Sequence, residues 1–112
     1  MNSFDELVNK TVSEYKSDPR NKVFVDENLL LLSVREETGN AVSAENLRGI
    51  IRSYQCGDLD TNGESIYDGA VYVCGRVARM CFSEDPDIED LDYEISWIEN
   101  DDGSFTAEVR PN

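Results

Sequence analysis

The side chains best suited to chemistry in this sequence are carboxylates, and they are concentrated in one segment. Residues 84–102 contain ten acidic side chains and no lysine or arginine. These ten are Glu84, Asp85, Asp87, Glu89, Asp90, Asp92, Glu94, Glu99, Asp101 and Asp102. Because such a run of like charge attracts cations, we expect it to bind a basic partner; the alternative interpretation is that the charge serves only solubility.

The acidity belongs to one half of the chain. Residues 1–56 hold nine acidic and seven basic side chains, a net charge of −2, whereas residues 57–112 hold fifteen and three, a net charge of −12. Nucleic-acid binding requires cations that displace counterions from phosphates. Arg76, Arg79 and Arg110 are the only cations of the second half. We therefore expect no direct contact with nucleic acid.

Several classes of protein are disfavoured by composition. The chain has no histidine, which excludes Ser-His-Asp and Cys-His triads within it, so we expect a protein that is not an enzyme. Its three cysteines, Cys56, Cys74 and Cys81, form no closely spaced pair, which indicates free thiols, no zinc site and a cytoplasmic location. The longest apolar stretch, Leu29 to Leu32, is too short to span a membrane, and the first residues lack a signal-peptide pattern.

A second candidate for chemistry is a group of oxygen donors near the middle of the chain. Asp58, Asp60 and Asn62 alternate and are followed by Gly63, as in the first half of a calcium loop. The segment resembles the start of an EF-hand or dockerin loop. The twelfth position, where that resemblance implies an acidic ligand, is Gly69. The alternative interpretation is a polar turn between two helices.

The elements that position these groups follow from periodicity and end signals. A helix is expected over residues 3–16, where Ser3 and Glu6 form a capping box, and β-structure over residues 22–25. Residues 26–38 favour a helix between Asp26 and Gly39, with a hairpin as the alternative. A third helix is expected from Ser43 to Gly57.

The second half is expected to form one helix and a hairpin. A polar loop over residues 58–65 precedes a helix over residues 69–82, and an acidic connector covers residues 84–92. Alternating apolar residues around a Gly-containing turn then predict a hairpin over residues 93–110, with Tyr93 and Trp97 on its core side. The expected fold class is α+β in a single compact domain, 1–112: about four short helices and a C-terminal β-hairpin, with residues 22–25 as a candidate third strand.

The order of these elements resembles a winged helix with an inserted fourth helix. The helix in the recognition position carries only Arg48 and Arg52, and the wing over residues 99–102 is acidic. Such a wing repels phosphate, so we expect that this scaffold is not used on DNA.

Three hypotheses of function follow. The first is an acidic inhibitor that mimics DNA on the basic surface of a nuclease or other nucleic-acid-binding protein, of the phage anti-CRISPR, anti-restriction or nuclease-immunity type. The second is a calcium-binding helix-loop-helix module at residues 58–68; otherwise we expect no cofactor. The third is an acidic adaptor or scaffold domain that binds through an apolar patch. The oligomeric state is left open.

Overall fold

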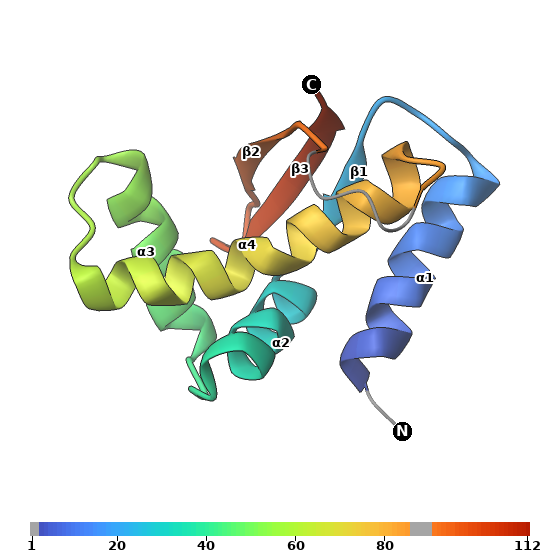
Figure 1. Cartoon of the computed structure of the whole chain (residues 1–112). Helices are drawn as coiled ribbons and strands as arrows, with labels where there is room; N and C mark the ends of the chain where they lie inside the picture. Colours follow the sequence, from blue (N-terminus) through green and yellow to red (C-terminus); the bar gives the residue numbers. More distant parts are fainter. Residues whose placement is uncertain (1–2, 86–90) are drawn as a thin grey trace.

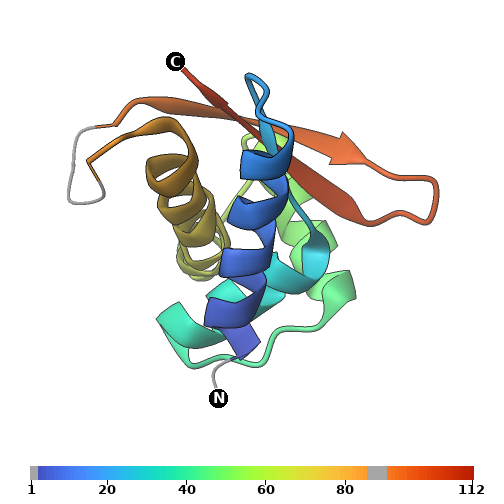
Figure 2. The same cartoon turned by 90° about the vertical axis from the view of Figure 1, so that its right-hand side faces the viewer.

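The computed structural model describes residues 3–85 and 91–112, which form two layers (Figures 1 and 2). A three-stranded antiparallel sheet lies on the helices, which cover one of its faces and leave the other open (Figure 2). The predicted α+β class is therefore confirmed. The elements are α1 (Ser3–Ser17), β1 (Val23–Val25), α2 (Glu27–Thr38), α3 (Ala44–Gln55), α4 (Thr61–Phe82), β2 (Tyr93–Glu99) and β3 (Phe105–Pro111).

The segment 26–38, for which the sequence favours a helix with a hairpin as the alternative, forms the helix α2. The carboxylate of Asp26 accepts a hydrogen bond from the backbone N–H of Leu29 at 3.0 Å, so it satisfies one of the free donors of the first turn. Gly39 ends the helix with a φ of 72°, and its N–H donates to the carbonyl of Arg35. The two end signals outweigh the β-propensity of the residues before Asp26.

The helix α4 begins eight residues earlier than the sequence predicts, at Thr61 instead of Gly69. The carboxylate of Asp60 accepts the N–H of Gly63 at 2.7 Å and starts the helix, and Ile66 and Tyr67 in the following turns are buried. The predicted polar loop over residues 58–65 is therefore wrong from Thr61 onward. An Asp-rich sequence that looks like a turn is here a helix cap.

The long helix α4 is the centre of the fold. It packs against α1, α2, α3 and all three strands, and runs through the middle of the molecule (Figure 1). Its buried face contains Ala70, Val73, Cys74, Val77 and Ala78. The resemblance to a winged helix treats this element as an insertion, but the other helices and the sheet depend on it for their core.

The central strand of the sheet is β3, and the strand order is β1-β3-β2. Val23 lies opposite Val109, and Ile95 lies on the other side of the same residue. Residues 22–25 thus contribute the candidate third strand, and the predicted hairpin is present. None of the described helices has the length and apolar character needed to cross a membrane.

Candidate functional site

Seven of the ten acidic residues proposed as a partner-binding surface are described. Asp87, Glu89 and Asp90 lie outside the described residues. All seven others are exposed, and they are Glu84, Asp85, Asp92, Glu94, Glu99, Asp101 and Asp102. The structure therefore presents every described member of the set to solvent.

The hairpin divides these seven residues into two groups. Glu84, Asp85, Asp92 and Glu94 lie where α4 ends and β2 begins, and the other three lie at the hairpin turn. The two places are at opposite ends of the sheet (Figure 2). At about 3.3 Å per residue, Asp92 and Asp101 are roughly 30 Å apart along the chain. The site is therefore not a single cluster. We call the carboxylates on and beside β2, which are Asp92, Glu94, Glu99, Asp101 and Asp102, the strip.

Basic side chains neutralise little of this strip. Among Asp92, Glu94, Glu99, Asp101 and Asp102, the ion pair formed with another described residue joins Glu99 to Arg52 at 3.9 Å, and both side chains are more than half exposed. Arg110 lies opposite Glu94 in the sheet, but its guanidinium donates to the hydroxyl of Ser96. Exposed pairs of this kind contribute little stability, so most of the negative charge of the strip is available to a partner.

Asp102 differs from the other members because it shapes the turn. Its carboxylate accepts hydrogen bonds from the hydroxyl and the backbone N–H of Ser104. These bonds lower the pKa of Asp102, and the charge of Arg48 acts in the same direction. Arg48 is itself held by Glu27 through two hydrogen bonds of 2.8 and 3.0 Å, which raise the pKa of the guanidinium. Asp102 is thus first a structural residue of the hairpin.

A second acidic feature was not predicted from the sequence. Glu37 from α2 and Glu64 and Asp68 from α4 line a hollow of about 530 Å³, together with the rings of Tyr72 and Tyr93. We call it the acidic hollow. Glu64 and Asp68 are four residues apart and share a helix face, but the predicted loop over residues 58–65 concealed that spacing. No basic side chain lines this hollow among the described residues.

Aromatic side chains fix β2 on α4. The rings of Tyr54 and Tyr67 stack with centroids 3.9 Å apart, and the indole N–H of Trp97 donates to the hydroxyl of Tyr67 at 3.1 Å. Burial raises the pKa of Tyr67 well above that of a free tyrosine. Tyr93 and Trp97 pack against the core with part of each ring exposed. They are on the core side, as the sequence predicts, but they also form part of the surface.

The arrangement required of a calcium loop is not formed around Asp58, Asp60 and Asn62. Asn62 already belongs to the first turn of α4, and the carboxylate of Asp60 is engaged by the N–H of Gly63. A calcium loop wraps around the ion, with oxygens from positions 1, 3 and 5 as ligands and a sharp turn at the glycine of position 6. Within residues 3–85 and 91–112, no group of three or more cysteine and acidic side chains has metal-binding geometry.

The three cysteines are free thiols, as the sequence predicts. Cys56 is exposed, whereas Cys74 lies in the core and Cys81 at its margin. Burial raises the pKa of the Cys74 thiol to about 12 and that of Cys81 to about 11. Both are therefore protonated near neutral pH and are poor nucleophiles.

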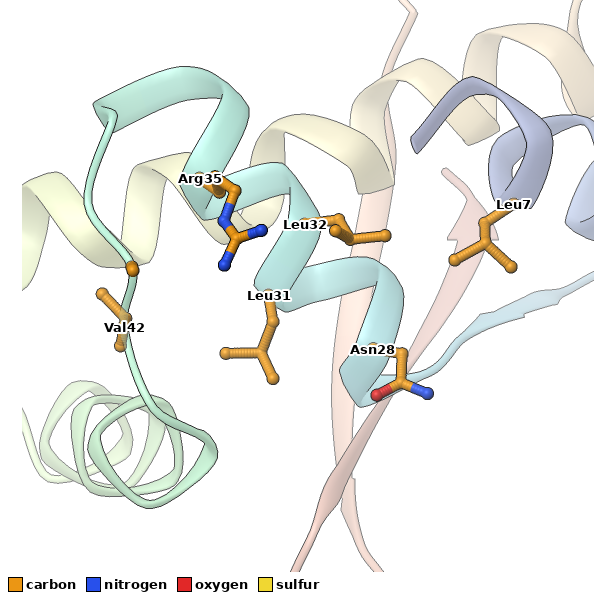
Figure 3. A pocket seen from close by; sticks show the side chains of 7 residues that line it. Leu7, Asn28, Leu31, Leu32, Arg35 and Val42 are labelled. Carbon is orange, nitrogen blue, oxygen red and sulfur yellow. The ribbon is translucent and has the colours of Figure 1, made fainter. Parts of the chain in front are cut away.

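An apolar hollow lies beside α2, lined also by Leu7 of α1 and by Val42, which follows α2 in the chain (Figure 3). It has a volume of about 330 Å³, and we call it the leucine hollow. Leu7 of α1 and Leu32 of α2 point toward each other, and Leu31, Arg35 and Val42 also line the hollow (Figure 3). Leu31 and Leu32 are only partly buried, because the core takes Leu29 and Leu30 of the four-leucine run.

No family model, no curated protein and no solved structure matches this chain, so the surfaces described above are the basis on which a function is proposed.

Proposed function

We propose that this protein is a non-enzymatic acidic inhibitor that occupies the basic nucleic-acid-binding surface of a protein partner. The partner is a nuclease or a related nucleic-acid-binding protein, as for anti-CRISPR, anti-restriction and nuclease-immunity proteins. The observation that carries the proposal is the strip of exposed carboxylates along β2, which basic side chains barely neutralise.

The dimensions of the strip support mimicry of a nucleic-acid backbone. Asp92, Glu94, Glu99 and Asp101 are distributed over roughly 30 Å of chain, whereas a DNA strand carries one phosphate per ~3.4 Å of axis. The carboxylates are thus sparser than phosphates, but the strip is about as long as one turn of duplex. A groove lined with arginine and lysine would meet negative charge at both ends of this length.

The acidic hollow gives the partner a more specific contact. A guanidinium that enters it meets the carboxylates of Glu37, Glu64 and Asp68 and the faces of two tyrosines. Tyr72 is 41% exposed, so its ring is accessible to such a cation. Arginine favours this combination of planar carboxylates and aromatic rings.

Location and chemistry are part of the same proposal. We place the protein in the cytoplasm, because exposed Cys56 remains a thiol only in a reducing compartment. The proposal includes no catalytic step, since the described carboxylates serve as charges and the buried thiols are protonated.

The test is binding to purified CRISPR nucleases, restriction nucleases and nuclease toxins, which are the targets of the three inhibitor classes. Binding is measured by calorimetry at 50 and 300 mM NaCl, with DNA as competitor. We expect a complex that DNA displaces and that weakens at least about tenfold at the higher salt, as for other charge-driven contacts. At 50 mM NaCl, the variant Asp92→Asn/Glu94→Gln/Asp101→Asn should bind the nuclease more weakly than the native protein does.

The matched control is Glu6→Gln/Glu14→Gln/Glu36→Gln, which removes the same charge from exposed positions of α1 and α2. Equal weakening by both variants would show that only total charge matters. Affinity that is indifferent to salt, or a ternary complex with DNA, would count against the proposal.

The leucine hollow favours a second candidate function, an adaptor that binds through an apolar patch. Leu31 and Leu32 expose apolar surface that the core does not require (Figure 3). This alternative predicts that Leu31→Ser/Leu32→Ser abolishes binding to a partner while the triple acidic variant leaves it intact. The inhibitor proposal predicts the reverse pattern.

A further inference from the structure

The two edge strands of the sheet differ in how completely their inward-facing side chains are buried. At the β1 edge, the inward-facing side chains of Val23 and Val25 are buried, because α1 packs beside them. At the β2 edge, the inward-facing Tyr93, Ile95 and Trp97 all stay partly exposed. An additional strand beside β2 would complete their burial.

The backbone of β2 offers hydrogen-bonding groups along this edge. The N–H of Asn100 donates to the carbonyl of Ser104, and the N–H of Asn112 donates to the carbonyl of Asp92. In an antiparallel pair such bonds alternate along the strand, so even-numbered residues of β2 direct their N–H and C=O groups toward β3. Odd-numbered residues, Tyr93 to Glu99, direct theirs away from the sheet.

Among the described residues, these outward N–H and C=O groups have no backbone hydrogen-bond partner. Within residues 3–85 and 91–112, the backbone of β2 makes hydrogen bonds to β3 alone. The strand is seven residues long and contains no lysine, proline or glycine. Lysine and proline commonly protect an exposed edge, and here the charges of Glu94 and Glu99 act against acidic strands only, so the edge is open to a basic strand.

We infer that β2 accepts an extended, basic segment of the partner protein as a fourth strand. The inference rests on the proposed function and specifies how the partner is held: main-chain hydrogen bonds supply affinity, and charge selects the sequence. Basic residues of the added strand lie beside Glu94 on the outer face of the sheet, and its apolar residues lie beside Ile95 and Trp97 on the inner face.

Charge decides between a basic segment and a second copy of this chain. Residues 92–102 carry five carboxylates and no basic side chain, and the whole chain has a net charge of −14. Pairing two β2 edges would bring the ten carboxylates of two such segments together, four of them within the paired strands, and like charges on adjacent strands are destabilising. A strand rich in lysine or arginine is instead attracted to the carboxylates of this segment.

The test uses two synthetic peptides of ten residues and equal charge. One alternates lysine with valine, and the other has proline at two of the valine positions, which removes two N–H donors. Amide exchange of the full-length protein is followed by NMR with each peptide. With the first peptide, we expect exchange to slow at least about tenfold at Tyr93, Ile95, Trp97 and Glu99, and to stay unchanged at Glu94 and Ser96.

The proline peptide is expected to bind at least about tenfold more weakly, which corresponds to about 1.4 kcal/mol, the worth of one or two hydrogen bonds. Equal binding of both peptides without protection at the four odd positions would overturn strand addition and leave the inhibitor proposal intact. Protection that grows with protein concentration in the absence of peptide would show that a second copy occupies the edge.

Absence of binding by either peptide would also overturn the inference. The proposed function fails separately, when no nuclease shows salt-dependent, DNA-competitive binding. The two failures are therefore distinguishable.

Discussion

At the scale of single residues, the contact between α2 and α4 depends on a serine and a glycine. Ser33 is buried, and its hydroxyl donates to the carbonyl of Gly69 in the facing helix. A Cβ atom at Gly69 would lie 3.1 Å from the methyl group of Thr38 and 3.3 Å from the Cα atom of Val34. A methyl group at this position would therefore be in tighter than ordinary van der Waals contact with α2.

This contact predicts opposite effects for two glycine-to-alanine substitutions within helices. Gly69→Ala should lower the free energy of unfolding by about 1–3 kcal/mol, because the overpacked helices must separate. Gly49→Ala in α3 is the matched control: nothing lies within 4 Å of its added Cβ, so we expect a gain of up to about 1 kcal/mol from helix propensity. Urea denaturation measures both. Stabilisation by both substitutions would mean that α2 and α4 are not in close contact.

At the scale of elements, periodicity and end signals predicted most of the fold. The first three helices, the hairpin and the third strand follow from apolar spacing and from caps such as Asp26 and Ser43. The start of α4 did not, because Asp60-Thr61-Asn62-Gly63 has the composition of a turn. The Asp60 cap and the burial of Ile66 and Tyr67 against the rest of the chain favour the helix there.

The candidate site shows the same division between local and non-local information. The acidic strip was evident from composition alone, and its extended form followed from the predicted hairpin. The acidic hollow depends on how α2 docks on α4, which brings Glu37 beside Asp68. The spacing of residues along the sequence does not predict this contact between two helices, so the hollow is seen only in the structure.

The start of α4 provides a prediction at this scale. Asp60→Ala removes the acceptor of the Gly63 N–H and should lower the free energy of unfolding by about 1 kcal/mol, with a range of about 0.5–2. Asp58→Ala removes the same charge from an exposed residue just outside the helix, and we expect it to be nearly neutral. Thermal and urea unfolding of the two variants at equal ionic strength make the comparison. Equal losses would indicate that Asp60 does not cap a helix.

At the scale of the whole molecule, the fold is built without the charge that it carries. The core is one continuous apolar cluster drawn from all four helices and from β1 and β3, and none of the strip residues belongs to it. A net charge of −14 on a body of 36 × 31 × 30 Å repels itself. The acidity therefore weakens the folded state, which is consistent with its retention for binding.

This conflict predicts that salt acts in opposite directions on stability and on binding. The Debye length falls from about 30 Å at 0.01 M salt to about 8 Å at 0.15 M, so repulsion across the whole molecule is reduced to repulsion between neighbours. The melting temperature should rise by several degrees over this range, since about 1 kcal/mol shifts it by about 4–8 °C in a small domain. Calorimetric scans at 0.01, 0.05 and 0.15 M NaCl measure the rise, and the same salt steps should weaken the complex with a nuclease.

The variant Asp92→Asn/Glu94→Gln/Asp101→Asn separates repulsion from general effects of salt. It should melt above the native protein at 0.01 M NaCl and show a smaller rise with salt, because three of the mutually repelling charges are gone. Sodium and potassium chloride should act alike, since only ionic strength matters in this range. A variant that melts lower than the native protein at 0.01 M would show that these carboxylates stabilise the fold, and the strip would then no longer be surplus charge kept for a partner.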